Sequence, residues 1–237
     1  MQTTDSDTTL SHTLTNGGKS SLKLVIGNKN YSSWSMRPWI AMTAFGIPFE
    51  ERRILLDQPD TASRIAEISS AGRVPVLQAG AITIWDSLAI CEYLAEQFPD
   101  LHLWPQDVAA RAMARSICAE MHSGFGGLRS AMSMNIRMSY PGKGRTPDAQ
   151  ADIGRICEIW EECLSRFGHH QFLFGAFSIA DAYYAPVLMR FRSYQVSLAP
   201  ALQAYADRVA AHPAVAQWMR EALAEPERSA KYDAGPD

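Results

Sequence analysis

Residues 73–90 read RVPVLQAGAITIWDSLAI, and this stretch decides the fold of the first half of the chain. Short apolar runs lie on both sides of Gly80, which is typical of a β-hairpin with a tight turn. Asp86 and Ser87 follow the second run, and both residue types are favoured at the N-terminus of a helix. The stretch therefore predicts a hairpin that leads directly into an amphipathic helix over 86–98.

The residues before this stretch predict two more strands and two helices. The apolar run 22–26 predicts a strand, and it is followed by a short helix over 38–46, a strand over 49–56 and a weak helix over 61–68. The complete order is strand, helix, strand, helix, strand, strand, helix. A short α/β unit of this βαβαββα order resembles the thioredoxin fold, which has a mixed sheet.

The remainder of the chain predicts helices only, over 107–137, 148–167, 178–191, 199–211 and 213–223. We therefore expect an all-α C-terminal helical bundle after the α/β domain. The expected boundaries are a disordered tail over 1–20, a thioredoxin-like domain over 21–98, a linker over 99–106 and the helical domain over 107–237.

The composition excludes several classes of function. Hydrophobic residues make up 47% of the chain and charged residues 20%, which is typical of a globular protein. A net charge of −3 offers no basic surface for nucleic acid, and no apolar run reaches the roughly 20 residues that cross a membrane. The 4 cysteines form no CxxC pair and no metal-ligand spacing. We expect reduced core thiols, no metal and a cytoplasmic location.

A serine-rich loop, NYSSWSMRP over 30–38, follows the first predicted strand. Pro38 fits the first turn of a helix, because proline lacks an N–H, and this makes Ser35 the expected N-cap. Ser32 and Ser33 then lie beside a helix N-terminus, where free N–H groups and the helix dipole favour an anion. The alternative is that these serines only cap the helix or form the loop.

A serine hydroxyl at this position is strong enough to activate a bound thiol. Lowering a thiol pKa of ~8.5 by about two units requires roughly 2.7 kcal/mol. A hydrogen bond to a charged group contributes about 1.5–3 kcal/mol, and a helix N-terminus adds about 0.3–1 kcal/mol. One hydroxyl and the dipole together therefore suffice.

Two motifs in the opening stretch can hold an extended peptide. Pro75 stands at the entrance to a strand, where thioredoxin-like folds have a cis proline, and this exposes the Val74 backbone for pairing. Asp86 and Ser87 at the helix start can hold an amino-acid headgroup, since it carries both an ammonium and a carboxylate. The alternatives are a simple strand-start proline and a simple helix cap.

Together, the serine loop, Val74-Pro75 and Asp86-Ser87 resemble the cytosolic glutathione transferase superfamily, in its bacterial, serine-type form. The resemblance implies an enzyme, glutathione S-transferase, with glutathione as co-substrate, a small electrophile as second substrate and a homodimer. The residues that it assigns to glutathione are Arg73, Val74, Pro75, Asp86 and Ser87, with Ser32 or Ser33 at the sulfur. Ser178 and Asp181 are similar to the buried capping box of the family.

Within the superfamily, the serine loop is most similar to the zeta class, which includes maleylacetoacetate isomerases. That class has Ser-Ser-Cys here, and matching its arginine to Arg37 assigns Ser32 the activating position. This chain has Trp34 in place of the cysteine, and Ser193 where the class has a substrate-binding arginine. Arg190 and Arg192 flank Ser193, but a helix turns about 100° per residue, so neither is expected to replace that arginine.

The second substrate is expected between the two domains. Trp34, Met121, His122 and Phe125 are the candidate wall for a small electrophile, and the alternative is that they are core residues. The glycines over 124–127 predict a kink or a close approach, within the chain or at a dimer interface. Two other classes stay open, which are a non-catalytic binding module and a glutathione-dependent oxidoreductase. The oxidoreductase would need a cysteine at the serine loop.

Overall fold

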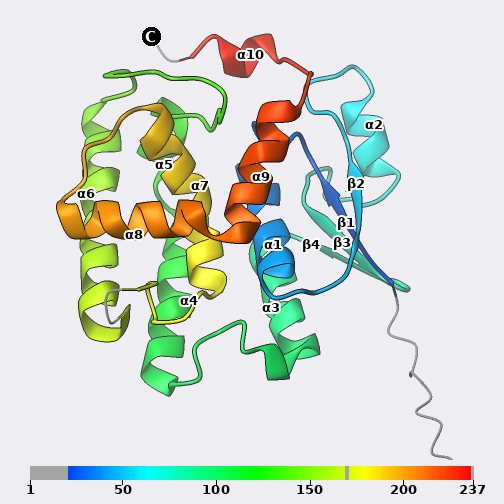
Figure 1. Cartoon of the computed structure of the whole chain (residues 1–237). Coiled ribbons are helices and arrows are strands. Elements are labelled where there is room, and N and C mark those ends of the chain that lie inside the picture. Colours follow the sequence, from blue (N-terminus) through cyan, green and yellow to red (C-terminus); the bar gives the residue numbers. More distant parts are fainter. Residues whose placement is uncertain (1–20, 169–170, 236–237) are drawn as a thin grey trace, which may run out of the picture.

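The computed structural model describes residues 21–168 and 171–235. The tail predicted over 1–20 lies outside these residues. A sheet with its helices forms one part of the molecule, and a bundle of longer helices lies beside it (Figure 1). Helix α1 lies between the sheet and the bundle, so the two parts share a large contact.

Four strands form the mixed sheet that the sequence predicted. The order across the sheet is β2-β1-β3-β4, with β1 parallel to β2 and antiparallel to β3, and β3 antiparallel to β4. The strands are β1 Leu22–Ile26, β2 Glu50–Arg53, β3 Val76–Ala79 and β4 Ile82–Trp85. The thioredoxin-like fold of the first half is therefore confirmed.

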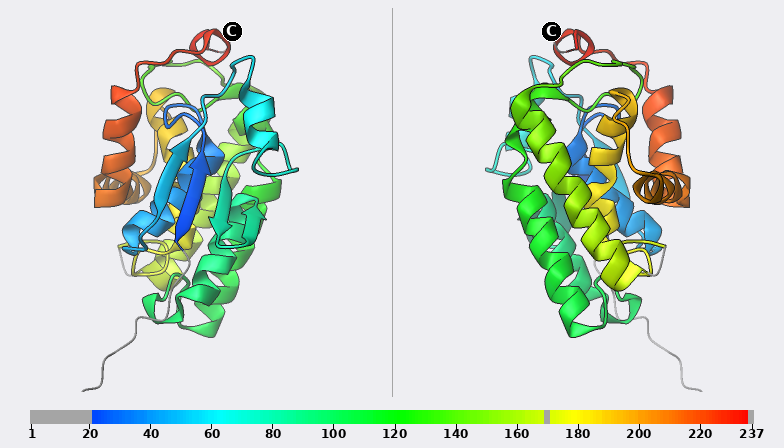
Figure 2. Two further views of the ribbon diagram at one scale, coloured as in Figure 1. Left: turned by 90° about the vertical axis from the view of Figure 1, so that its right-hand side faces the viewer. Right: turned by 90° about the vertical axis from the view of Figure 1, so that its left-hand side faces the viewer.

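The two faces of the sheet are covered by different helices. The first half contains α1 Ser33–Ala44, α2 Thr61–Ala66 and α3 Ser87–Gln97. Alternate residues of a strand point to opposite faces, so Val25 packs towards Ile65 of α2, while Leu24 and Ile26 pack into the core formed with α1 and α3. Figure 2 (left) shows the sheet in front of the helical bundle.

Helix α1 begins earlier than the sequence predicted. Its first residue is Ser33 and Pro38 is inside the helix, so Ser32 and not Ser35 precedes the first turn. A proline in this position lacks the N–H that would bond to the Trp34 carbonyl. The Ser35 hydroxyl instead lies in the interior, where its oxygen accepts a hydrogen bond from the Gly27 amide at 3.1 Å.

The second half is helical, as predicted. Two short segments, η1 Pro99–Leu101 and the π-helical η2 Leu164–Gly168, accompany the longer helices. Figure 2 (right) shows α4 and α6 side by side on the outer face of the bundle. The helices are α4 Val108–Ser123, α5 Gly126–Ala131, α6 Pro147–Cys163, α7 Ile179–Ser193, α8 Pro200–Ala211, α9 Pro213–Ala224 and α10 Ala230–Asp233.

The glycine-rich segment breaks the long helix that was expected over 107–137. Phe125 has a φ of +57° and separates α4 from α5. A Cβ atom on Gly127 would lie 2.7 Å from the backbone of Asp148 at the start of α6. The glycines therefore produce both a kink and a close approach, and the close approach is within the chain.

The C-terminal segment 225–235 runs from the end of α9 across the top of the molecule in Figure 1, and it contacts the loop that precedes α1. The Glu225 carboxylate accepts hydrogen bonds from the backbone amides of Lys29 at 2.7 Å and Asn30 at 3.2 Å. The Tyr31 hydroxyl donates to Asp233 at 2.8 Å, and the Tyr31 ring stacks on Tyr232. The sequence did not predict this contact.

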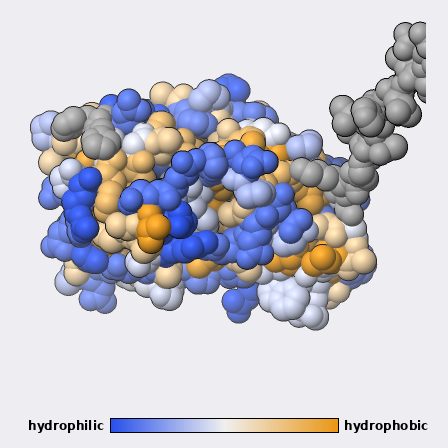
Figure 3. All heavy atoms as spheres, turned by 90° about the horizontal axis from the view of Figure 1, so that it is seen from below, coloured by the Kyte–Doolittle hydropathy of each residue, from blue (hydrophilic) through white to orange (hydrophobic). Residues whose placement is uncertain are grey.

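The surface mixes polar and apolar residues. On the face seen from below, hydrophilic residues separate the hydrophobic patches (Figure 3). Across residues 21–168 and 171–235, no helix combines the length and apolar character that a membrane span requires.

The buried capping box at the start of α7 is present, as the resemblance implied. Ser178 and Asp181 exchange hydrogen bonds, the Ser178 amide donating to Asp181 at 2.9 Å. Asp181 also accepts from the Leu173 amide and from the Tyr205 hydroxyl. Burial raises the pKa of the Asp181 carboxyl from its ordinary value of 3.8 to about 6, although these donors favour the charged form.

This raised pKa predicts a specific pH dependence of stability. Because the native state binds the Asp181 proton more tightly than the unfolded state, the stabilisation is complete below about pH 4 and is lost as the pH rises through about 6. The Asp181→Asn variant lacks this titration. We expect the free energy of unfolding of the wild type, relative to that of the variant, to fall by on the order of 2 kcal/mol between pH 4 and pH 7. Urea unfolding at several pH values measures this difference.

The matched control is Asp207→Asn on α8, since Asp207 is exposed. It should leave the pH profile unchanged. If the free energies of unfolding of wild type and Asp181→Asn differed by the same amount from pH 4 to pH 7, the raised pKa of Asp181 would be contradicted.

Candidate functional site

Two adjoining cavities lie where the sheet domain meets the helical bundle. Cavity A has a volume of about 710 Å³ and cavity B about 470 Å³. Trp34, Arg73 and Val74 line both cavities. Cavity A also has Ala71, Pro75, Trp85, Asp86, Ser87, His122 and Ser123 in its wall. Cavity B also has Ser32, Ser33, Arg129 and Arg190, with residues of α2 and of the C-terminal segment.

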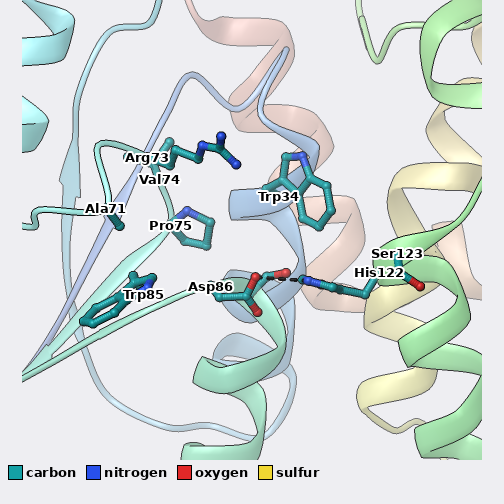
Figure 4. A pocket seen from close by; sticks show the side chains of 10 residues that line it. Trp34, Ala71, Arg73, Val74, Pro75, Trp85, Asp86, His122 and Ser123 are labelled. Carbon is teal, nitrogen blue, oxygen red and sulfur yellow. Dashed lines mark ion pairs between the residues drawn. The ribbon is translucent and has the colours of Figure 1, made fainter. Parts of the chain in front are cut away.

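The backbone at Val74 is available to a ligand. The Val74–Pro75 peptide bond is cis, as the resemblance to the thioredoxin fold implied. The ladder between β1 and β3 ends at the pair Val25–Val76, so Val74 lies beyond it. Figure 4 shows Val74 and Pro75 on one side of cavity A, with the Arg73 side chain directed towards Trp34. A polar main chain outside the ladder can therefore pair with an extended peptide.

Asp86 combines a cap with an unusual backbone. Its φ is +78°, a conformation that costs free energy in a residue with a side chain. One carboxylate oxygen accepts from the Leu88 amide at 2.8 Å and from the Ala89 amide at 3.3 Å. The other oxygen lies 3.2 Å from His122 Nε2. The capping geometry thus directs a carboxylate oxygen towards the cavity and the helical domain, as Figure 4 shows.

Beyond its contact with Asp86, His122 is connected to Ser87 by two hydrogen bonds through the helical domain. His122 Nδ1 lies 2.9 Å from the Tyr183 hydroxyl, which lies 2.9 Å from Ser87 Oγ. The Ser87 side chain is buried and already has this partner. A ligand headgroup at this corner is therefore met by the Asp86 carboxylate and the start of α3 more directly than by the Ser87 hydroxyl.

The two serines of the loop lie together in the wall of cavity B but differ in their bonds. Ser32 Oγ donates to Ser35 Oγ at 2.7 Å. Ser33 Oγ accepts from an Arg190 Nη atom at 3.4 Å. Ser33 is the first residue of α1, so its hydroxyl lies at the positive end of that helix.

Arg190 lines cavity B, although this residue was considered on sequence grounds and set aside. It lies three residues before Ser193 on α7, hence on the same side of the helix, whereas Arg192 is exposed. Only 6% of Arg190 is exposed, and it faces Ser33. Burial, together with the nearby charges of Arg37 and Arg129, lowers the pKa of Arg190 to about 9. The signal in the sequence was the i, i+3 spacing.

Aromatic rings hold the neighbouring arginines. The guanidinium carbon of Arg37 lies 4.2 Å from the centroids of both the Trp34 and the Tyr183 rings. Arg129 lies 5.3 Å from the Trp34 ring and donates to the Gly124 carbonyl. Cation–π contacts contribute about 0.5–2 kcal/mol each. Trp34 therefore contacts two cations, Arg37 and Arg129, at the position where the resemblance to the zeta class implied a small cysteine.

The structure brings together two of the four residues of the expected wall for an electrophile. Trp34 and His122 line cavity A and meet in an edge-to-face contact, with ring centroids 5.3 Å apart. Met121 and Phe125 instead pack in the hydrophobic core and line neither cavity. Met121 points inward because the buried face of α4 packs against α7.

The described residues contain no activated thiol and no cluster for a metal. Cys91, Cys118 and Cys163 are buried, and Cys157 is half-buried. Burial raises the pKa of all four thiols, that of Cys163 to about 12. Within residues 21–168 and 171–235, no group of three or more His, Cys, Asp or Glu side chains could hold a metal ion.

Comparisons with known proteins agree with this geometry. The family model "Glutathione S-transferase, N-terminal domain" matches residues 31–97, and "Glutathione S-transferase, C-terminal domain" matches residues 110–221. Maleylacetoacetate isomerase of Rattus norvegicus is 31% identical over 71% of this chain and 78% of its own length. A probable maleylacetoacetate isomerase of Caenorhabditis elegans is 37% identical, but over 40% of this chain and 44% of its own length.

Solved structures give the same fold. A glutathione transferase homolog from Burkholderia with bound glutathione has a TM-score of 0.66 and 27% identity, covering 86% of this chain and 98% of that one. A silkworm glutathione S-transferase has a TM-score of 0.67 at 18% identity, covering 86% and 97%, and shows the fold alone.

The thiols give a testable prediction about the site. Three of the 4 cysteines are buried and their pKa values are raised, so these three should not react with Ellman's reagent in the native protein near pH 8. Cys157 alone should react, and its reaction should be slow. All four should react in denaturant. The Cys157→Ser variant should abolish the native reaction, and a fast native reaction that survives this change would show that a reactive thiol had been overlooked.

Proposed function

The chain belongs to the glutathione S-transferase family, and we propose that it activates the thiol of bound glutathione with a serine hydroxyl at the start of α1. The thiolate then attacks a small electrophile. The observation that carries this proposal is the position of Ser32 and Ser33, beside a helix N-terminus and next to a cavity with an open peptide-binding edge.

Cavity A suits glutathione. Its volume of about 710 Å³ is in the usual range of ligand pockets, roughly 300–1,000 Å³. Asp86 offers a carboxylate to the γ-glutamyl ammonium, and Val74 offers backbone groups to the cysteinyl residue. Arg73 offers a cation to a glutathione carboxylate. The bound glutathione of the Burkholderia homolog supports this assignment.

The sulfur is expected where the two cavities adjoin. Trp34, Arg73 and Val74 line both, so a peptide paired with Val74 can extend from the Asp86 corner to the serines. The thiol proton leaves to solvent, and a hydroxyl donates to the resulting thiolate. The sulfur electron pair forms the new C–S bond, and with an aryl halide the halide leaves with its bonding pair.

A second candidate function is a cis–trans isomerisation, because several relatives are named as isomerases. Maleylacetoacetate isomerases of Rattus norvegicus and of Drosophila melanogaster match over 71% and 78% of this chain. In such a reaction the thiolate adds to the double bond, a single bond rotates and the thiolate leaves again. Arg129 and Arg190 in the wall of cavity B suit a substrate with carboxylates. A homodimer and a cytoplasmic location stay predictions.

The experiment that tests the function combines calorimetric titration with glutathione and two assays of turnover. One assay follows conjugation of chlorodinitrobenzene and the other follows isomerisation of maleylacetone. Turnover in either assay supports an enzyme of the proposed class and distinguishes its two forms. Binding without turnover would favour the non-catalytic binding module, and absence of glutathione binding would contradict the proposal.

The role of Asp86 gives a sharper prediction. Asp86→Asn keeps an acceptor for the Leu88 amide, so the cap of α3 is retained. It removes the charge that faces the γ-glutamyl ammonium, and a hydrogen bond to a charged group contributes about 1.5–3 kcal/mol. We expect the dissociation constant of glutathione to rise by about 10–100-fold, with the folded structure unchanged by circular dichroism.

The matched control for this prediction is Asp100→Asn, because Asp100 is an exposed carboxylate that lines neither cavity. An equal loss of affinity in both variants would mean that Asp86 acts through overall charge and not through contact with the ligand.

A further inference from the structure

The hydroxyl proton of Ser32 is directed into the protein. Ser32 Oγ donates to Ser35 Oγ at 2.7 Å, and the same Ser35 oxygen accepts from the Gly27 amide at 3.1 Å. Ser35 is completely buried. A hydroxyl has one proton to donate, so in this arrangement Ser32 has none left for a ligand in cavity B.

Ser33 has the opposite arrangement. Its oxygen accepts from an Arg190 Nη atom at 3.4 Å. Among the residues that the structure describes, no acceptor takes the Ser33 hydroxyl proton. Ser33 lines cavity B, so that proton is free to bond to an anion in the cavity.

Arg190 is a buried cation without a carboxylate partner. Its second Nη donates to the Pro186 carbonyl at 3.3 Å, and its Nε has no hydrogen-bond partner in the described structure. In residues 21–168 and 171–235, none of the ion pairs within 4.0 Å involves Arg190. A buried charge that lacks a counter-ion is costly if its role is only structural.

We propose that Ser33, and not Ser32, donates to the glutathione sulfur, and that Arg190 is the positioning residue that orients and polarises the Ser33 hydroxyl. This inference rests on the proposed function. It departs from the family resemblance, which assigned the activating position to Ser32. The thiolate of the bound ligand is then the anion that the guanidinium of Arg190 lacks.

Two effects of Arg190 act in the same direction. A hydrogen bond donated to the Ser33 oxygen makes the hydroxyl a stronger donor, since hydrogen bonds in a chain polarise one another. The positive charge also favours the thiolate over the thiol. Burial lowers the pKa of Arg190 to about 9, so the guanidinium stays charged near pH 7. Both effects reach the sulfur through one side chain of α7.

The first test measures the local field without glutathione. A cysteine is introduced by Ser33→Cys or by Ser32→Cys, and its alkylation by iodoacetamide is followed against pH by peptide mass spectrometry, which separates it from the 4 native cysteines. We expect the thiol at position 33 to titrate at least one unit below the ordinary ~8.5, and the thiol at position 32 to titrate higher. The reverse order would overturn the proposal.

The second arm tests Arg190. In the Ser33→Cys background, Arg190→Gln keeps a hydrogen-bond donor but removes the charge, and it should raise the thiol pKa by about one unit, a tenfold change in the ionisation constant. Arg190→Lys should restore the lower value. Arg192→Gln on the exposed side of α7 is the matched control and should have no effect. Equal values in the Arg190→Gln and Arg192→Gln backgrounds would overturn the role of Arg190.

The last arm returns to glutathione. Ser33→Ala should lower kcat/KM for conjugation at least tenfold more than Ser32→Ala does, and the opposite ranking would overturn the proposal. A lowered thiol pKa at position 33 without glutathione binding would contradict the proposed function but not the effect of Arg190 on position 33. Turnover of glutathione with an ordinary thiol pKa at position 33 would contradict only the proposed role of Ser33 and Arg190. Should Arg190→Gln fail to fold, the comparison of positions 32 and 33 still decides, because it leaves Arg190 unchanged.

Discussion

The site depends on one constraint, which is that both halves of the chain fix the N-terminus of α1. From the sheet side, the Gly27 amide donates to Ser35 and holds the first turn against β1. From the bundle, Trp218 Nε1 donates to the Lys29 carbonyl at 3.0 Å, and the Glu225 carboxylate takes the Lys29 and Asn30 amides. A hydroxyl placed by so many bonds needs little reorganisation when a charge develops beside it.

The same packing explains how charge is tolerated in the interior. Arg37, Arg129 and Arg190 lie close together, and beside the effect of burial the charges of Arg37 and Arg129 lower the pKa of Arg190. The faces of Trp34 and Tyr183 partly replace the solvation that Arg37 loses. Burying a charge costs several kcal/mol before such compensation. Because the cations Arg129 and Arg190 lie in the wall of cavity B, this cavity is suited to an anionic ligand.

Local sequence signals predicted much of the fold and part of the site. The hairpin around Gly80, the cis Val74–Pro75 bond, the Asp86 cap and the Ser178–Asp181 box each depend on residues close together in the chain, and each is present. Contacts between residues far apart in the chain could not be predicted from local sequence. Ser33 and Arg190 are 157 positions apart, and Glu225 is 196 positions from Lys29. The start of α1 was misplaced because Pro38 is tolerated inside the helix, and Met121 and Phe125 pack inward because the bundle, not the helix pattern, decides which face is buried.

The central claim is that a serine hydroxyl, with no cysteine at this corner, stabilises the glutathione thiolate. The most direct measurement is the ultraviolet absorbance of the thiolate of bound glutathione, titrated against pH in the wild type and in the Ser32→Ala, Ser33→Ala double variant. The account predicts a pKa about two units below that of a free thiol, ~8.5, in the wild type, and a return towards that value in the double variant. A bound thiol with the solution pKa in the wild type, or a depressed pKa that survives the loss of both hydroxyls, would contradict it.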